Sequence, residues 1–321
     1  MTLMIGGIFF ITSCGEPAPE IHPSKIKMNL TVNPGEWVSV PAGEFISGLN
    51  GHHLDMDYDF EIMKTEVTNS EFAQYLNAAY SQEKIYVKNG NVMGHYKGDV
   101  FGGGGDVGRH EKRVPAQDYE YYNLNGVRAR IQFSDGAFSV ASGYENFPAT
   151  YVSWTGAYAH ADFYGWRLPL KYEWEKAARG TDGRSYPFGN FEPTPEYGNY
   201  HHSHDPFDSF NGLTPIGFYN GNTHGDFSTK DSKSPYGCYD MAGNVAEWTG
   251  DLIIGSHQRY IYGGSMMEYG FEMRSYTENS GVMGHVDDEV GYVPPYMSFQ
   301  VGFRCVRSEF QPNVMEDQSH H

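Results

Sequence analysis

Residues 167–180 (RLPLKYEWEKAARG) and residues 238–249 (CYDMAGNVAEWT) are the two stretches that decide the fold of this 321-residue chain. In the first stretch, Pro169 suits the first turn of a helix, and Gly180 suits its C-terminal cap. The sequence therefore predicts a short helix, followed by mostly loop from residue 181 to residue 235. The side chains that this helix turns largely inward are Tyr172, Trp174, Ala177 and Ala178.

Two further helices are predicted on the N-terminal side of this stretch. One spans residues 155–164 of the segment YVSWTGAYAHADFYGW. The other begins after Thr68, which together with Glu71 has the spacing of a capping box. The apolar face of that helix consists of Phe72, Tyr75, Leu76 and Ala79.

Residues 81–145 have a different character, because they are rich in glycine and tyrosine and contain short alternating runs. Asn-Gly and Asp-Gly dipeptides lie between these runs, which predicts β-hairpins. Gly103, Gly105 and Gly108 match the glycine spacing of a dinucleotide site. The residues that follow, RHEKRVP, cannot begin a helix, so the pattern favours a flexible loop.

The composition is that of a folded, loop-rich protein, with 19% charged and 16% aromatic residues. The formal net charge of −18 repels phosphate backbones, so we expect no nucleic-acid partner. An acidic chain of this kind suits an extracytoplasmic setting that contains calcium. No internal repeat is visible, which predicts one domain over residues 36–308 and a flexible tail over residues 309–321.

The N-terminal residues 1–14 (MTLMIGGIFFITSC) form an apolar run that is too short to span a bilayer as a helix. The ending ITSC fits a bacterial lipoprotein signal peptide, in which Cys14 is lipidated and becomes the new N-terminus. Residues 15–35 would then tether the domain to the membrane of the cell envelope, on the periplasmic side or the cell surface. Two other interpretations of this run remain, an ordinary cleaved signal peptide and a buried strand of a cytosolic protein, since no Lys or Arg precedes the apolar residues.

Six segments together resemble the formylglycine-generating enzyme (sulfatase-modifying factor) family. The resemblance implies an α+β, C-type-lectin-like fold with low regular secondary structure, short antiparallel strands and about three helices. It leaves residues 81–145 as a divergent insertion. The segments are KTEVTNSEFAQYLNA (64–78), YVSWTGAYAHADFYGWRLPLKYEWEKAARG (151–180), YPFGN (186–190), YGCYDMAGNVAEWTGD (236–251), YGGS (262–265) and VGFRCVR (301–307).

The resemblance also implies a chemistry that this chain does not carry. Catalytic family members bind copper through two cysteines that follow GGS, and copper(I) favours such soft sulfur ligands. Aligned from GGS, these two positions are Glu268 and Met273. The tryptophan of the family's NVWEWT is Ala246 here. We therefore expect a degenerate site near Ser265, no copper and no formylglycine oxidation.

Two cysteines remain after Cys14, which excludes a disulfide framework and permits one bridge. In catalytic relatives, the cysteine of GFRC can pair with a cysteine in the helix before RLP. That place is Ala161 in this chain, so the resemblance implies that Cys305 is a free, buried thiol. Cys238 is interpreted as a core residue.

The resemblance implies two structural calcium sites. Their residues suit this ion, since calcium takes six to eight hard oxygen ligands, many of them backbone carbonyls in loops. The alternative is that the two carboxylates of the first site cap turns or pair with Arg304 or Arg167. The first site would consist of Asp240, Gly243, Val245 and Glu247, and the second of Asn199, Tyr200, Asp208 and Phe210.

The histidines of HHSHD (201–205) suit zinc, copper or iron, but neighbouring residues seldom converge on one ion, so a solvated polar loop is favoured.

A set of large side chains is expected to line or flank the degenerate site. They pack in the core or form a surface that binds a peptide, a glycan or a partner protein. The set is Met266, Met267, Tyr269, Phe271 and Met273.

The leading hypothesis is an extracytoplasmic lipoprotein, anchored in the membrane through lipid on Cys14, that acts as a calcium-stabilised binding or scaffold module. Its partner would be an envelope protein or a glycan or peptide ligand, an expectation that rests on fold-level analogy. One alternative is a divergent metal-dependent oxidase that uses the HHSHD loop. Another is a lectin-like protein for ligand binding or display.

Overall fold

The computed structural model describes residues 21–100, 113–208, 212–253, 256–287 and 291–309. Within these ranges it has three α-helices and many short strands, most of them paired antiparallel, which confirms the predicted α+β class. The helices are α1 (Asn69–Ser81), α2 (Trp154–Phe163) and α3 (Lys171–Arg179), with short 3-10 helices η1 (Pro23–Lys25) and η3 (Gly270–Met273). The strands are β1 (Trp37–Val40), β2 (Gly43–Ser47), β3 (His52–Met56), β4 (Phe60–Met63), β5 (Ile85–Lys88), β6 (Asn91–Tyr96), β7 (Asp99–Val100), β8 (Arg113–Val114), β9 (Gln117–Asn123), β10 (Ile131–Ser134), β11 (Ala137–Val140), β12 (Thr223–His224), β13 (Phe227–Ser228), β14 (Ala246–Leu252), β15 (Gln258–Tyr262), β16 (Asn279–Val282), β17 (His285–Asp287), β18 (Gly291–Val293), β19 (Val301–Gly302) and β20 (Val306–Arg307).

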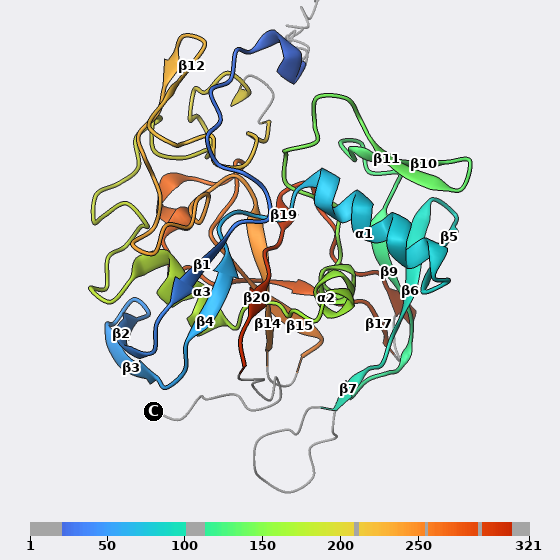
Figure 1. Ribbon diagram of the computed structural model, residues 1–321. Coiled ribbons are helices and arrows are strands. Elements are labelled where there is room, and N and C mark those ends of the chain that lie inside the picture. The colour runs from blue at the N-terminus through green and yellow to red at the C-terminus, as the bar shows by residue number, and fades with distance from the viewer. Residues whose placement is uncertain (1–20, 101–112, 209–211, 254–255, 288–290, 310–321) are drawn as a thin grey trace, which may run out of the picture.

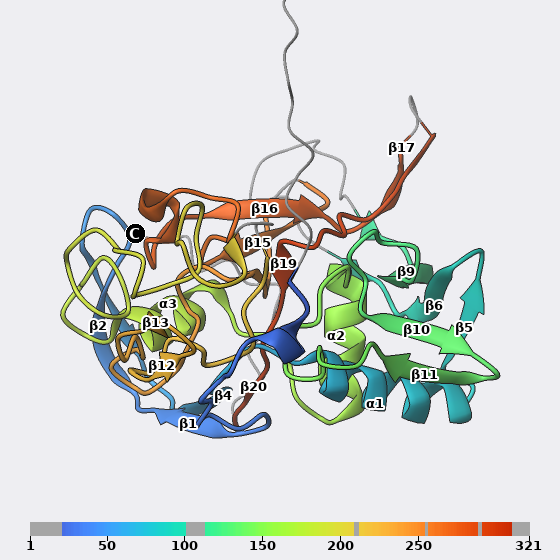
Figure 2. The ribbon, with the colours of Figure 1, turned by 90° about the horizontal axis from the view of Figure 1, so that it is seen from above.

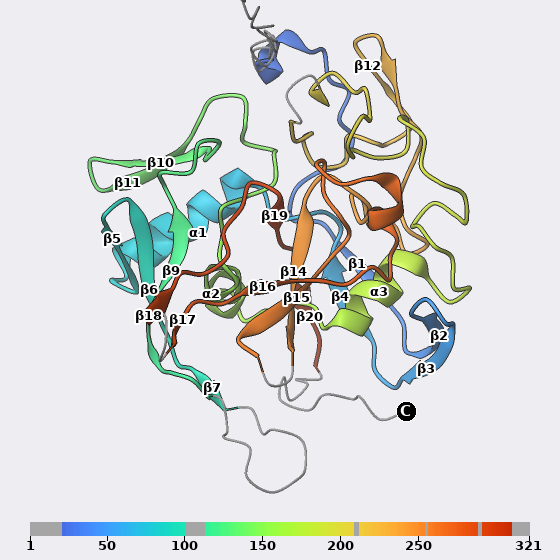
Figure 3. The same ribbon diagram turned by 180° about the vertical axis from the view of Figure 1, so that it is seen from behind.

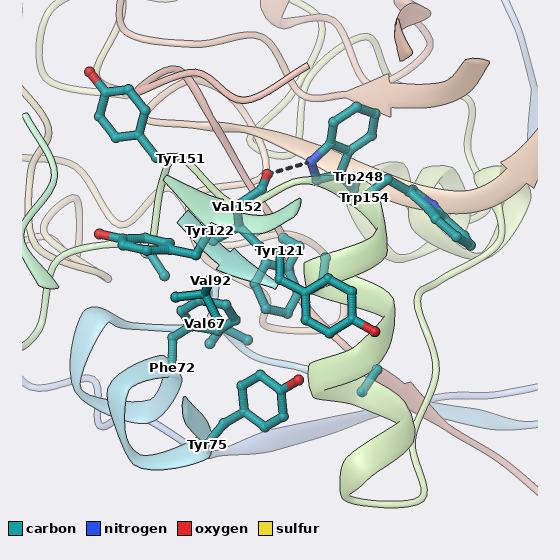
Figure 4. Close-up of a cluster of buried hydrophobic side chains, with 14 of the residues drawn as sticks. Val67, Phe72, Tyr75, Val92, Tyr121, Tyr122, Tyr151, Val152, Trp154 and Trp248 are labelled. Carbon is teal, nitrogen blue, oxygen red and sulfur yellow. Dashed lines mark hydrogen bonds between the residues drawn. The ribbon is translucent and has the colours of Figure 1, made fainter. Parts of the chain in front are cut away.

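Helices α1 and α2, the sheet β5–β6–β9 and the hairpin β10–β11 gather on one side of the molecule (Figure 1). We call this the aromatic half, because rings dominate its core. Phe72 of α1 lies 5.7 Å from Tyr122 of β9, measured between ring centroids. Trp248 of β14 donates a hydrogen bond from its indole N–H to the Val152 carbonyl, at 3.1 Å (Figure 4). Burial of these large rings is the main source of stability in this half.

The predicted helices form for the local reasons that the sequence indicates. At the start of α1, the Thr68 hydroxyl accepts a hydrogen bond from the Glu71 N–H, and the Glu71 carboxylate accepts one from the Thr68 N–H. This is the capping box. Ser153 caps α2 in a similar way, and Gly180 ends α3 with a φ of 69°. The three helices are confirmed, with boundaries one or two residues from those expected. The placement of Pro169 in the first turn of α3 is wrong, because α3 begins at Lys171 with Leu170 as its N-cap and Pro169 lies before the helix.

Two hairpins in residues 81–145 are also confirmed. Strands β5 and β6 join at Asn89-Gly90, and β10 and β11 join at Asp135-Gly136. All four residues have positive φ, as a type I′ turn requires. The region is an integral part of the aromatic half, because its Val92 and Tyr122 are fully buried against α1. The residues of the GxGxxG pattern, 103–108, lie outside the described ranges.

The opposite side, which we call the loop half, contains α3, the sheet β1–β4–β20, the hairpin β2–β3 and the long loops between residues 181 and 245 (Figure 2). Its core packs around Trp174, Ala177 and Ala178 of α3, all fully buried. A sheet with the strand order β16–β15–β14–β19 runs between the two halves (Figure 3). In it β14 pairs antiparallel with β15 and parallel with β19.

Residues 21–35, which the sequence assigned to the tether, pack against the domain in the structure. Ile26, Met28 and Leu30 cover an aromatic cluster that includes Phe147 and Phe218. The packed part of the chain therefore begins before Glu36. In the described ranges, no helix is long and apolar enough to cross a bilayer. Cys14, and with it the predicted lipidation, lies outside them.

Candidate functional site

The chain turns sharply after β15 and enters the region of the degenerate site. Gly263 and Gly264 have φ values of 97° and 66°, and a Cβ atom on Gly264 would lie 3.0 Å from the Glu272 carbonyl oxygen. Glycine is therefore needed for the close approach of these two backbone segments. The turn buries Ser265, whose hydroxyl donates to the Gln300 side-chain oxygen at 3.2 Å. Ser265 is thus engaged in packing the turn.

Glu268 and Met273 occupy different environments in the structure. Met273 is fully buried and packs with Tyr186 and Ala242. Glu268 is half-buried, and one of its oxygens accepts a hydrogen bond from the Asn279 side chain at 3.3 Å. Its other oxygen, Oε2, is buried without a partner among the described residues. Burial, followed by the charge of Glu272, raises the pKa of Glu268. The buried thioether of Met273 and the single carboxylate of Glu268 cannot replace a pair of thiolates as copper(I) ligands.

The HHSHD loop lies beside Glu268, which the sequence did not reveal. The His201 backbone N–H donates to the Glu268 carbonyl at 2.9 Å, and the His201 ring packs edge-on against Tyr269 at 5.1 Å. His201 Nδ1 is buried and has no hydrogen-bond partner in the part of the chain described. His204 turns to Asp208, at 3.5 Å. Nowhere in the described ranges do three or more His, Cys, Asp or Glu side chains converge as metal ligands.

Two aromatic residues next to Glu268 face solvent. Tyr269 is 55% exposed and Phe271 is 53% exposed, and their rings lie 6.2 Å apart at an interplanar angle of 6°. Met266 and Met273, in contrast, are core residues, and Met267 is half-buried. The expected cleft surface is therefore reduced to Tyr269, Phe271 and the edge of Met267, an exposed apolar patch of the kind that marks interaction sites.

The turn from Asp240 to Asn244 brings the first predicted calcium site together. Asp240 and Asn244 both have positive φ, and a Cβ atom on Gly243 would collide with the Asn199 carbonyl oxygen. The Asp240 carboxylate accepts a hydrogen bond from the Gly217 N–H at 2.5 Å. Burial raises the pKa of Asp240 to about 6. A buried acid at this turn calls for a proton or a cation nearby.

Glu247, the second carboxylate of that predicted site, is paired with Arg304. The Arg304 guanidinium donates to both Glu247 oxygens, each at 2.7 Å, and neither side chain is exposed. Trp174 also donates to Glu247 at 2.9 Å. Of the two pairings that the sequence left open, the structure shows the one with Arg304, while Arg167 pairs with Glu173 at 2.6 Å. Such a bidentate pair leaves little carboxylate capacity for another cation.

Glu66 joins this cluster and was missed by sequence reasoning. Its Oε1 accepts a hydrogen bond from the Asn244 side chain at 3.0 Å, and its Oε2 is buried with no partner among the residues described. Burial, reinforced by the charge of Asp240, raises the pKa of Glu66 well above its ordinary value. Arg304 therefore bonds one buried carboxylate, that of Glu247, and lies close enough to Glu66 and Asp240 to lower the pKa of both. The sequence signal that could have identified Glu66 is its place in the family segment KTEVTN, two residues before the N-cap Thr68.

The residues of the second predicted calcium site are only partly brought together. Asn199 donates to the Gly212 carbonyl at 2.9 Å, and its own carbonyl accepts from the Asn244 N–H at 2.7 Å. Asp208 instead accepts from the His204 N–H at 2.9 Å. Tyr200 donates its hydroxyl to the Pro193 carbonyl at 3.2 Å, and Phe210 lies outside the described ranges.

Both remaining cysteines are free and fully buried, as predicted. Burial raises the pKa of Cys238 to about 11 and raises that of Cys305 well above its ordinary value, so neither is a thiolate near neutral pH. Cys305 Sγ lies 3.6 Å from His160 Nδ1 in the aromatic core. Since burial also lowers the pKa of His160 to about 3, this imidazole is neutral and does not activate the thiol.

Comparisons with known proteins agree with the resemblance that the motifs carry. The FGE-sulfatase family, described as a sulfatase-modifying factor enzyme 1-like domain, matches residues 23–309. The inactive Cα-formylglycine-generating enzyme 2 of Mus musculus is 31% identical over 172 residues, covering 51% of this chain and 50% of that protein. The formylglycine-generating enzyme of Streptomyces coelicolor is 29% identical over 251 residues, covering 74% and 73%. The chain thus spans about half the length of the mouse relative.

Solved structures show the same fold. PvdO from Pseudomonas aeruginosa superposes with a TM-score of 0.55 at 18% identity, covering 92% of this chain and 100% of that one. CarF superposes with a TM-score of 0.52 at 20% identity, covering 86% and 99%. The predicted C-type-lectin-like fold of the formylglycine-generating-enzyme type is therefore confirmed.

Proposed function

Because this chain belongs to the FGE-sulfatase family, we propose that it is a non-catalytic member that acts as a binding or scaffold module. The observation that carries the proposal is the fate of the two cysteine positions. Met273 is part of a core cluster, and Glu268 is a half-buried acid, so two thiolates are absent from the place where the family oxidase needs them. The similarity to a relative that is itself named inactive supports this proposal.

The binding surface of this module would be the patch formed by Tyr269, Phe271 and the edge of Met267, together with His201, which packs against Tyr269. Two exposed rings with parallel planes give a rigid apolar contact area, which suits the core of a protein–protein interface. Beside them, Glu268 Oε2 and His201 Nδ1 lack partners within the described chain. They would bond polar groups of the partner. We therefore propose that the partner is an extended peptide segment of an envelope protein.

We propose further that the protein is a bacterial lipoprotein attached through Cys14. The support is the apolar run that ends in ITSC, together with the acidic, loop-rich composition. In cells, Cys14→Ser should move the protein from the detergent-soluble membrane fraction to the aqueous fraction. Retention of the variant in the membrane fraction would contradict lipid anchoring.

Structural calcium remains a proposal that the residues fit in part. The unpartnered Glu66 Oε2 beside Asp240 provides a buried carboxyl oxygen that a cation could bind. Glu247 does not offer a free oxygen, because both of its oxygens bond Arg304. Calcium would therefore be held mainly by Asp240 and by backbone carbonyls such as those of Gly243 and Val245.

Two measurements test the calcium proposal and the non-catalytic proposal. The purified chain, prepared without a metal column and dialysed, is assayed by mass spectrometry for calcium, copper, iron and zinc. About one or two calcium ions per chain and no redox metal would support the structural role. Incubation with a cysteine-containing sulfatase peptide, copper and oxygen should yield no formylglycine. The Streptomyces coelicolor relative serves as the positive control.

A divergent oxidase is the second candidate, and His201 next to Glu268 is the observation that favours it. It predicts stoichiometric copper or iron that is lost together with oxygen uptake in His201→Ala. The variant His53→Ala, in the exposed part of β3, is the matched control. Redox metal that depends on His201 and not on His53 would overturn the non-catalytic proposal.

A further inference from the structure

A groove of about 430 Å³ opens in the aromatic half, between α1, α2 and the sheet β5–β6–β9. This volume is typical of small-molecule sites. None of its lining residues belongs to the patch of Tyr269 and Phe271 or to the turn at Asp240. It is lined by Tyr75, Ala79, Glu83, Lys84, Ile85, His95, Tyr96, Lys97, Tyr121, Tyr158, Ala159, Asp162 and Phe163.

Phenol groups form the inner wall of the groove. Tyr75 and Tyr121 are 2% and 3% exposed, and Figure 4 shows their rings side by side beneath the sheet. The Tyr121 hydroxyl donates to the His95 carbonyl at 2.8 Å, so its oxygen is left to accept. The Tyr75 hydroxyl has no hydrogen bond to any described residue, and Tyr75 lines the groove, so this hydroxyl is available to a ligand there. The inner wall thus offers one hydroxyl donor and one hydroxyl acceptor.

The mouth of the groove carries both signs of charge. Lys84 Nζ lies 4.9 Å from the centre of the Phe163 ring, and Lys97 Nζ lies 5.9 Å from that of Tyr158. Glu83 and Asp162 place two carboxylates on the same lining. The two lysines balance the two carboxylates, so the charge at the mouth favours neither an anionic nor a cationic ligand.

We propose that this groove binds a neutral saccharide unit. Such a ligand carries hydroxyl groups that both donate and accept, which matches the Tyr75 and Tyr121 hydroxyls and the mixed charges of the mouth. Its C–H face packs on an aromatic ring, and the half-buried Tyr158, backed by Trp154 at 5.3 Å, provides one. An anionic ligand would meet Glu83 and Asp162, and a cationic one would meet Lys84 and Lys97. A purely apolar ligand would leave the Tyr75 hydroxyl unpaired.

The test is a glycan array of neutral and acidic oligosaccharides probed with the purified full chain, followed by calorimetric titration with the best neutral oligosaccharide. Tyr75→Phe removes only the hydroxyl and should weaken binding by about two- to tenfold, the range of one hydrogen bond. Tyr86→Phe is the matched control, because Tyr86 follows Ile85 in β5 but does not line the groove. It should bind as the wild type does.

A second variant keeps the test decisive if Tyr75→Phe disturbs the core. Asp162→Asn changes one exposed side chain at the mouth, so it should leave thermal unfolding unchanged and weaken binding. The proposal is overturned if no neutral saccharide is retained or if acidic glycans are retained instead. It is also overturned if Tyr75→Phe and Asp162→Asn both bind as tightly as Tyr86→Phe.

Discussion

The aromatic half and the loop half are held together by different interactions. In the aromatic half, helices and hairpins bury rings such as Phe72 and Tyr122, and its buried histidine, His160, is neutral. In the loop half, regular structure is short, and buried charges bond the backbone directly. Arg304, for example, also donates to the carbonyls of Met63 and Tyr239. Where ladders of backbone hydrogen bonds are missing, charged side chains take over the backbone groups.

The largest effect is expected from removal of the central cation of the loop half. Arg304→Met leaves Glu247 buried without its partner and should lower the free energy of unfolding by about 3–5 kcal/mol. Arg307→Met is the control, since its pair with Glu61 is largely exposed and worth about 0–1 kcal/mol. Chemical denaturation measures both. Equal losses in the two variants would contradict the role of the buried Arg304–Glu247 pair in holding the loop half together.

One buried group in each half, His160 and Asp240, should contribute a pH dependence of stability, and the two contributions have opposite signs. Burial lowers the pKa of His160 to about 3, below the value near 6.5 of the unfolded chain. The unfolded state therefore takes up this proton first, and stability is lost as the pH falls from about 6.5 toward 3. At pH 4.5 the loss should be about 2–3 kcal/mol. His160→Phe should remove this part of the pH dependence.

Asp240 should act in the other direction. Burial raises its pKa to about 6, so between about pH 4 and 6 the folded state holds a proton that the unfolded state has released. Stability from this group therefore falls as the pH rises through that window. Asp240→Asn, which tolerates the positive φ, should flatten the fall. Thermal unfolding from pH 4 to pH 8 in the presence of a calcium chelator tests both variants, and slopes of the same sign would refute the contrast.

The smallest effect concerns local structure in the aromatic half. Thr68→Ala removes the side-chain cap of α1 and should lower the free energy of unfolding by about 1 kcal/mol. Ser81→Ala at the exposed end of the same helix is the control and should change it by less than about 0.5 kcal/mol. A loss near that of Arg304→Met would mean that local caps, too, carry the stability of the whole fold.

Much of the fold could be predicted from the sequence, because its signals are local. Thr68 and Glu71 are three residues apart, and each type I′ turn depends on two adjacent residues. The candidate site was harder to predict, since its contacts join distant segments. Nothing near His201 indicates that Glu268 is its neighbour, and nothing near Glu66 indicates Asp240. Such pairings depend on how long loops close, which no periodicity records.

The late position of β20 in the sequence determines when the sheet β1–β4–β20 can form during synthesis of the chain. Val306 pairs with Ile62 of β4, so the sheet β1–β4–β20 is complete only when the chain has been made as far as β20. Until then, β4 keeps an unpaired edge, and Glu247 has no Arg304 to neutralise it. Ribosomal synthesis proceeds from the N-terminus, so the loop half cannot close before residue 307 has been made. Because this closure joins segments that are more than 200 residues apart, it is expected to be slower than the formation of the local hairpins.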